Sequence, residues 1–236
     1  MMHLEMMVLG EEGERAEKVI IRNYKKDDFQ AIRQIERECY PPPFPETDLW
    51  DDEQLNRHLE VFPEGAICAT FLGEIVGSMT TLIIDDRKGT THDWDRMTAE
   101  GYLKGKHDQN GNSLYVADMI VSPSSRRHGI GRLLMQAAYF LVIEMSLERL
   151  LGSVRMPGYH KVADQMSPEA YLENVVSGKL RDPVITFMLK CGRKPIRVVH
   201  DYMDDHLSRN CAVLMEWRNP FLYRKRNLPS RIEYNY

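Results

Sequence analysis

A strand-like run followed by a basic, glycine-containing turn is the stretch of this sequence best suited to chemistry. It spans residues 113–132, SLYVADMIVSPSSRRHGIGR, and its turn comprises residues 126–131. Glycines let backbone amides approach an anion closely, because they have no Cβ. The first N–H groups and the positive dipole end of a following helix would point to the same place, and arginines add bidentate donors for phosphate. The pattern predicts a pyrophosphate site where a strand meets a helix.

Two other interpretations of this turn are weaker. Glycines also allow a helix to pack closely on the preceding strand, so an ordinary strand–turn–helix joint would contain them too. A nucleotide-binding protein is disfavoured, because the sequence has neither a G-x-x-x-x-G-K-[ST] loop nor a complete G-x-G-x-x-G pattern.

The pattern Arg126-x-x-Gly129-x-Gly131 resembles the Q/R-x-x-G-x-G/A signature of the GNAT superfamily of acyl-CoA-dependent N-acyltransferases. The likeness runs from about Val19 to Trp217. Four segments resemble more closely the GNAT domains that are fused ahead of a carbon–nitrogen hydrolase domain: PGYHK at 157–161, ADQMS at 163–167, DPV at 182–184 and EWRNP at 216–220. The chain of 236 residues leaves no room for that hydrolase, so no hydrolase activity is expected.

This resemblance implies where the co-substrate acetyl-CoA would bind. The pantetheine arm is expected along the strand, with a backbone N–H near Ile120 polarising the thioester carbonyl, and the pyrophosphate is expected in the turn. No metal is expected. The residues expected to bind coenzyme A are Met119, Ile120, Val121, Arg126, Arg127, His128, Gly129, Ile130, Gly131 and Arg132.

Asp118 is the one carboxylate inside this apolar strand. A buried carboxylate costs several kcal/mol unless it is paired or solvated, so we expect Asp118 to face a cleft. A carboxyl group whose pKa is raised by desolvation can act as a general base for an ammonium substrate. The structural alternative is that Asp118 accepts hydrogen bonds from neighbouring backbone or from Arg155.

The acid for the leaving thiolate is not the usual one. The resemblance places a tyrosine four residues ahead of a glycine, but the segment FMLKCG at 187–192 has Met188 there, which cannot donate a proton. Tyr159 and His160 are candidate replacements, because they are expected just after the strand that diverges from 113–122, and His160 titrates in the right range. The alternative is that these two residues only pack in a turn.

Asp93, Trp94 and Asp95 lie in a polar stretch, residues 85–112, and are candidates for contact with a cationic amine. Their carboxylates would attract the amine, and Trp94 would form a cation–π wall. The alternatives are a solvated acidic loop, or a metal site, which the lack of a second His or Cys ligand nearby disfavours.

Composition excludes several classes of protein. A content of 43% hydrophobic and 28% charged residues is typical of a globular domain, and a net charge of -4 argues against a nucleic-acid partner. The four cysteines form no C-x-x-C pair, which disfavours a zinc ribbon or a disulfide framework. No signal peptide and no apolar stretch near the roughly 20 residues of a membrane span is found. We expect a cytoplasmic protein with no membrane partner.

Elements that would position these residues follow one another in a mixed order. We expect strands at 18–24, 66–72, 75–84, 113–122, 149–155, 196–202 and 211–217. We expect helices at about 28–39, 50–62 and 132–147, a further helix that begins near 167, and a short one that ends at 190. They predict a single α/β domain (an α+β mixed sheet) of the GNAT-like fold, with a central twisted sheet of about seven strands flanked by helices.

The domain is expected to cover residues 18–220, with insertions at about 85–112 and 156–180. A flexible N-terminal segment, residues 1–17, would precede it, and a basic tail, residues 221–236, would follow it. A homodimer is possible by fold analogy.

The leading functional hypothesis is an N-acetyltransferase that transfers an acetyl group from acetyl-CoA to a primary amine by direct attack. The acceptor would be a small molecule or a peptide, and the sequence identifies neither it nor the preferred acyl chain. The alternative is a non-catalytic acyl-CoA-binding or regulatory module that partners a hydrolase, motivated by Met188.

Overall fold

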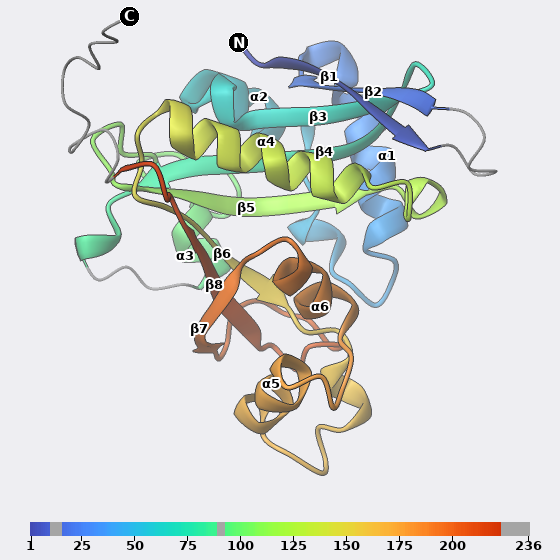
Figure 1. Cartoon of the computed structure of the whole chain (residues 1–236), viewed down its shortest axis with the longest axis vertical. Helices are drawn as coiled ribbons and strands as arrows, with labels where there is room; N and C mark the ends of the chain where they lie inside the picture. The colour runs from blue at the N-terminus through green and yellow to red at the C-terminus, as the bar shows by residue number, and fades with distance from the viewer. Residues whose placement is uncertain (10–15, 89–92, 223–236) are drawn as a thin grey trace, which may run out of the picture.

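One mixed sheet organises the chain, whose residues 1–9, 16–88 and 93–222 are described by a computed structural model. The strand order is β1-β2-β3-β4-β5-β6-β8-β7, and every neighbouring pair is antiparallel except β5 and β6. In Figure 1, β1 to β5 form the upper part of the sheet, and β6 to β8 turn away below. The strands are β1 (His3–Leu9), β2 (Ala16–Asn23), β3 (Ala66–Phe71), β4 (Glu74–Ile84), β5 (Ser113–Val121), β6 (Arg149–Arg155), β7 (Lys194–Val199) and β8 (Ala212–Arg218).

Helices flank this sheet. The longest, α4 (Ile130–Glu144), crosses the face that Figure 1 turns toward the viewer and contacts strands β2 to β6, while α1 (Phe29–Cys39) packs on β4 and β5. The other helices are α2 (Asp52–Val61), α3 (Trp94–Thr98), α5 (Pro168–Val176) and α6 (Pro183–Lys190). Single helical turns include η2 (Glu46–Asp48), η5 (Pro123–Ser125) and η6 (Tyr159–Lys161).

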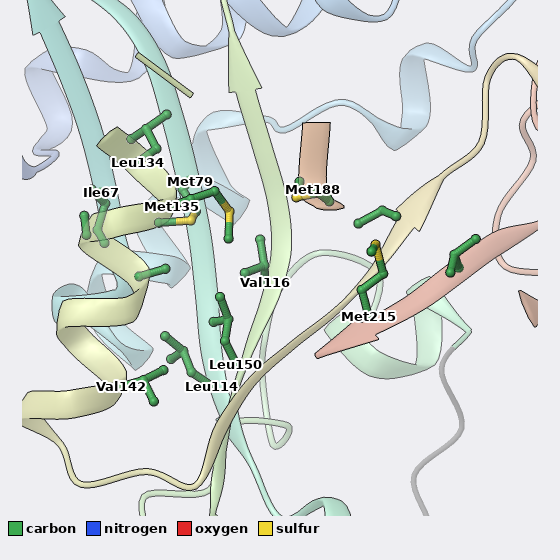
Figure 2. Close-up of a cluster of buried hydrophobic side chains, with 14 of the residues drawn as sticks. Ile67, Met79, Leu114, Val116, Leu134, Met135, Val142, Leu150, Met188 and Met215 are labelled. Atoms are coloured by element: carbon green, nitrogen blue, oxygen red, sulfur yellow. The ribbon is translucent and has the colours of Figure 1, made fainter. Parts of the chain in front are cut away.

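Buried apolar side chains form two clusters. The α4 cluster includes Ile67 and Ala69 of β3 together with side chains of α4 and α6, and the α1 cluster includes Ala66 and Cys68 together with side chains of α1 to α3. This division follows from the period of two in a strand, which sends successive side chains to opposite faces. Figure 2 shows part of the α4 cluster. Among the described residues, no helix is long and apolar enough to cross a membrane.

Local capping explains where two of the helices begin. The Asp51 side chain accepts from the Gln54 amide at 2.7 Å, and the Gln54 side chain accepts from the Asp51 amide at 2.8 Å, which is a capping box for α2. Asp182 caps α6 by accepting from two amides. In contrast, α4 has Gly129 at its N-cap and no side-chain cap, so the first amides of α4 remain open to a ligand.

The expected fold class is confirmed, with one difference at the N-terminal edge. The sheet has eight strands rather than about seven, because the segment before residue 18 contains β1, which pairs with β2 from His3 to Leu9. The expectation of a flexible N-terminal segment is therefore wrong for this part. Its apolar residues alternate, and Leu4 and Met6 pack against the α4 cluster. Most of the expected basic tail lies outside the described residues.

The stretch 85–112 was expected to be a long excursion, and its described part folds against the core. Trp94, Met97 and Leu103 are all buried in the α1 cluster. These apolar residues are spaced irregularly among polar ones, which explains why periodicity alone did not indicate a packed segment.

Candidate functional site

β5 and β6 pair over only part of their length, and we call the place where their backbones diverge the cleft. The two strands pair in parallel only from Ser113 and Arg149 to Tyr115 and Leu151, although β5 continues to Val121 and β6 to Arg155. Beyond this point they diverge, as Figure 1 shows. The inner edge of β5 therefore presents unpaired backbone groups that an extended ligand can pair with.

The register of β5 decides which of its amides face this cleft. The Ser122 amide donates to the Val76 carbonyl of β4 at 2.8 Å. Ile120 lies two residues earlier and pairs with Ser78 of β4, so its backbone groups are directed to the same side as those of Ser122. Because alternate residues of a strand direct their backbone groups to opposite sides, the amides of Met119 and Val121 face the cleft. The amide of Ile120 itself faces β4, so the amides beside it, and not its own, are the ones directed to the cleft.

A β-bulge places Asp118 at the cleft. Thr80 pairs with Asp118 and Thr81 with Val116, which leaves Ala117 as the extra residue. Ala117 joins the α1 cluster, and the next side chain, Asp118, also points to the α1 side, where it meets Tyr40. Without the extra residue, Asp118 would face α4 instead.

Trp94 holds this bulge in place. Its indole N–H donates to the Ala117 carbonyl at 3.0 Å, its ring stacks on Trp50 at 5.4 Å, and the residue is only 6% exposed. The expectation of a cation–π wall for substrate is therefore wrong for Trp94, because its ring faces are covered by protein. Asp93 caps α3 by accepting from the Arg96 amide at 2.9 Å, and Asp95 is exposed.

The turn before α4 has the geometry of an anion cradle. Gly129 has a φ of +80°, and nothing lies within 4 Å of a Cβ built there, so the space above this backbone is open. The amides of Gly129, Ile130 and Gly131 make no hydrogen bond within the described part of the chain. Gly131 is needed for a different reason, since a Cβ there would approach the Phe187 ring to 3.1 Å.

Positive charge surrounds this cradle. Arg126, Arg127 and Arg132 are exposed, and none of them forms an ion pair with a carboxylate of the described residues. Arg126 donates to the Val121 carbonyl at 3.3 Å, which ties the turn to the end of β5. The His128 ring nitrogen lies 3.3 Å from the Ser125 carbonyl and the ring lies beside Phe71. Unneutralised guanidinium groups at a helix N-terminus suit phosphate oxygens.

The carboxyl group of Asp118 is largely buried beside the cleft. Its Oδ1 accepts from the Tyr40 hydroxyl at 2.9 Å, and Oδ2 is buried. The buried indole N–H of Trp50 faces the carboxyl group of Asp118, and hydrogen bonding between them favours the ionised carboxylate and lowers its pKa. Burial dominates, however, and raises the pKa of Asp118 to about 6.

A second buried carboxyl group lies near Asp118. Glu36 of α1 is 2% exposed, and its Oε2 accepts from the Trp50 backbone amide at 2.9 Å. Burial, and then the charge of Asp118, raise the pKa of Glu36 to about 9. Two neighbouring carboxyl groups cannot both ionise cheaply in a dry site, so Glu36 holds its proton at neutral pH while Asp118 is ionised.

An ion pair on β6 lies beside Tyr40. Arg155 donates to both carboxylate oxygens of Asp205 at 2.7 Å, and its guanidinium lies 5.1 Å from the Tyr40 ring and 5.3 Å from the Phe44 ring. The expected pairing of Asp118 with Arg155 is thus replaced by an Arg155–Asp205 pair. The charge of Arg155 still favours the ionised form of Asp118.

The candidate acids make no hydrogen bond to Asp118 among the described residues. Tyr159 is 5% exposed, donates its hydroxyl to the Met166 carbonyl at 3.0 Å and belongs to the α4 cluster. His160 is half-buried, with Nδ1 2.7 Å from the Pro157 carbonyl. Met188 is 5% exposed and lies in the α4 cluster. Figure 2 labels it together with Val116 and Met215 of the same cluster.

Sequence reasoning missed Glu36, Tyr40 and Trp50. One signal was available, because Glu36 shares the apolar stripe of α1 with Phe29, Ile32 and Ile35, and a charged residue in such a stripe needs a reason. Among the described residues, no cluster of three His, Cys, Asp or Glu side chains is arranged to hold a metal ion.

Comparison with known proteins defines the class. The Acetyltransferase (GNAT) family profile matches residues 29–161, which contain α1, the bulged strand β5 and the cradle. The chain belongs to this family and is a GNAT-type acyltransferase. It is similar to an uncharacterized N-acetyltransferase, YkwB, of Bacillus subtilis, with 46% identity over 91% of this chain and 94% of YkwB.

One longer relative and one solved structure are also similar to this chain. A probable hydrolase, YhcX, of Bacillus subtilis is 37% identical over 86% of this chain, which spans only 39% of the length of YhcX. The solved structure of a GNAT-like decarboxylase, GphF, with isobutyryl-CoA is similar with a TM-score of 0.68 and 24% identity, over 84% of this chain and 98% of GphF. This last likeness concerns the fold.

Proposed function

We propose that this enzyme transfers an acetyl group from acetyl-CoA to a primary amine by direct attack of the amine on the thioester. The observation that carries the proposal is the Asp118 carboxylate, whose pKa burial raises to about 6 and which lies where β5 and β6 diverge. The open cradle before α4 lies at the end of the same strand. A non-catalytic module is not favoured, because the matching family and YkwB are both named as acetyltransferases.

Coenzyme A fits the residues present. The amides of Gly129, Ile130 and Gly131, with Arg126, Arg127 and Arg132, would hold the pyrophosphate, and the cleft-facing amides of Met119 and Val121 would pair with the pantetheine arm. When bound, the co-substrate supplies an electrophilic thioester carbonyl. An amide donor aimed at the oxygen of that carbonyl stabilises the negative charge that develops on it.

Asp118 is the proposed general base. An amine arrives as its ammonium form at neutral pH and must lose a proton before it can attack. With its pKa near 6, Asp118 is ionised at pH 7 and can accept a proton. Tyr40 fixes the orientation of the carboxylate through Oδ1.

His160, Tyr159 and Tyr40 are the proposed candidates for protonating the thiolate. Tyr159 is the weakest of them, because its hydroxyl is already donated to Met166. Tyr40 is added to the two expected residues because it is bonded to Asp118 and can exchange a proton with it.

Thermal unfolding with and without acetyl-CoA tests this proposal first, followed by thiol release with a panel of amines. A ligand present at a hundred times its Kd stabilises the folded state by about 2.7 kcal/mol. We expect a rise in Tm with acetyl-CoA that ATP does not produce, and thiol release that requires an amine. Binding without amine-dependent release would reject acyl transfer.

A second candidate reaction is decarboxylation of an acyl-CoA that carries a carboxylate. Met188 favours it, because a reaction that leaves the thioester intact needs no acid for a departing thiolate. The GphF structure, described as a decarboxylase, has the same fold. Incubation with malonyl-CoA separates the two reactions: decarboxylation yields carbon dioxide and acetyl-CoA without free thiol, whereas acyl transfer releases thiol.

A further inference from the structure

A thiol, an imidazole and a carboxylate from three separate segments lie in a row in the lower part of the molecule. Cys211 directly precedes β8, His200 directly follows β7, and Glu169 lies in the first turn of α5. The antiparallel pairing of Val199 with Ala212 brings His200 and Cys211 close together, and α5 contacts β7 (Figure 1). We call Cys211, His200 and Glu169 the thiol triad.

Hydrogen bonds join the three side chains of the thiol triad in order. The Cys211 Sγ lies 3.8 Å from Nδ1 of His200, which is within reach of a hydrogen bond to sulfur, and Nε2 of His200 lies 2.8 Å from Oε1 of Glu169. An ionised carboxylate only accepts, so neutral His200 carries its hydrogen on Nε2 and presents the lone pair of Nδ1 to the thiol. This order of nucleophile, base and orienting carboxylate is the one that activates cysteine and serine nucleophiles.

The thiol of Cys211 depends on this base for its reactivity. Cys211 is 8% exposed, and burial, followed by the charges of Glu169 and Asp201, raises the pKa of its thiol. The thiol is therefore protonated at neutral pH, although the thiolate is the reactive form. Transfer of the proton to His200 during attack removes this obstacle, and Glu169 stabilises the imidazolium that forms.

The backbone beside Cys211 favours attack on a sulfur atom over attack on a carbonyl group. The Cys211 amide donates to the Ser208 carbonyl at 3.0 Å, so the amide nearest the thiol is already used. A carbonyl electrophile needs such donors for the charge that develops on its oxygen. A disulfide develops that charge on the leaving sulfur instead, where a returning proton neutralises it.

We propose that the thiol triad is a site of reversible covalent modification, at which Cys211 forms a mixed disulfide with a small disulfide. The Cys211 sulfur gives its proton to His200 and bonds to one sulfur of R–S–S–R, whose S–S bond breaks. The departing sulfur takes the proton from His200 and leaves as R–SH. No other oxidant is consumed, because the disulfide accepts the two electrons itself. This site is independent of the proposed acetyl transfer.

Mass spectrometry of each cysteine during reaction with 2-hydroxyethyl disulfide, which is small and neutral, tests the proposal. Cys191 is the matched comparison, because burial raises the pKa of its thiol too, and among the described residues no histidine is hydrogen-bonded to it. Exposure alone predicts faster reaction at Cys191, which is half-buried, whereas Cys211 is buried. We expect Cys211 to react about tenfold faster than Cys191, and dithiothreitol to reverse the modification. Equal or faster reaction at Cys191 would overturn the proposal.

Variants of the thiol triad separate base catalysis from a structural role. His200→Gln should lower the rate at Cys211 about tenfold, and Glu169→Gln should lower it several-fold, because the imidazole loses its orienting partner. Loosened packing would have the opposite effect, since it would expose the thiol and raise the rate. His206→Gln, which removes an exposed histidine of the same loop, is the matched control and should leave the rate unchanged.

Cys68 provides an internal check on folding in these variants. It is fully buried, so it should remain unmodified wherever the fold is intact. An unchanged or faster rate at Cys211 in His200→Gln, with Cys68 still unmodified, would reject the role of the base. If Cys68 reacts in a variant, the ratio of the Cys211 and Cys191 rates in the original protein decides the proposal.

Discussion

Asp118 and Glu36 show how burial assigns different protonation states to two carboxyl groups in one site. The pKa of Asp118 is raised to about 6 and that of Glu36 to about 9. At neutral pH the pair therefore carries one proton, which Glu36 holds. The ionised Asp118 is the group that can accept a proton from an amine. Because Glu36 stays protonated, the two carboxyl groups together carry one negative charge rather than two.

Asp118→Asn tests the base directly. The variant keeps the Tyr40 hydrogen bond but cannot accept a proton, so we expect kcat to fall by about a hundredfold or more. In the unmodified enzyme, kcat/KM should rise as pH increases through about 6, because Asp118 must be ionised to act, and this limb should disappear in the variant. An unchanged Tm, measured alongside the pH profile, would exclude misfolding as the cause. Full activity with the same pH profile would remove Asp118 from the mechanism.

Glu36→Gln tests the second carboxyl group through stability. The folded state holds the proton of Glu36 up to about pH 9, whereas the unfolded chain releases it near its ordinary pKa of 4.5. The contribution of Glu36 to stability is therefore largest below about pH 4.5 and declines as pH rises toward 9. Glutamine has no such proton, so the free energy of unfolding of the variant relative to the original should grow with pH, by on the order of 1 kcal/mol per unit between pH 5 and 8. A difference in Tm that is constant over this range would contradict the raised pKa.

At the scale of elements, the end of β5, the turn and the start of α4 together form one structural unit. The α4 helix lacks a side-chain cap, and its N-cap Gly129 adopts a φ of +80°. Arg126 ties the turn back to the Val121 carbonyl. These features leave amides and guanidinium groups for an anion, at the end of the strand that borders the cleft.

Gly129→Glu should abolish acyl-CoA binding, because the side chain would fill the open space of the cradle with bulk and negative charge. Gly129→Asn is the matched control, since asparagine tolerates a positive φ and adds no charge. We expect the control to retain most of the affinity, measured by calorimetric titration with acetyl-CoA. Equal affinity in both variants and the original protein would place the pyrophosphate elsewhere.

Over the whole molecule, the two parts of the sheet are joined across the cleft by Arg155. This residue ends β6, pairs with Asp205 and lies over the rings of Tyr40 and Phe44, which follow α1. Because β5 and β6 pair over a short length only, such contacts help to fix the width of the cleft.

Removing one partner of this pair should destabilise the fold. Asp205→Asn leaves the half-buried Arg155 without its counter-charge, and we expect a loss of about 2 to 4 kcal/mol in the free energy of unfolding. Arg155→Met alone and the double variant complete a cycle that isolates the pair. Denaturant unfolding of the four proteins measures it. Additive effects would indicate that the pair does not couple the two parts.

Short-range patterns account for the elements that could be predicted. The hairpin at 66–84, the strand at 149–155 and the cradle at 126–131 depend on alternation, on turn glycines and on the residues next to them. β1 escaped prediction because a short edge strand is stabilised by its pairing with β2 rather than by a strong pattern of its own.

The sequence by itself determined the family, the central elements and the anion cradle, because each of these depends on residues that are neighbours in the chain. Only the tertiary structure decided which side chains share the cleft. Tyr40 meets Asp118 across 78 residues of sequence, and one extra residue at Ala117 turns Asp118 toward α1 rather than α4. These contacts depend on long-range packing and on the one-residue shift that the bulge introduces into the alternation of side chains along β5. Neither is encoded by local spacing.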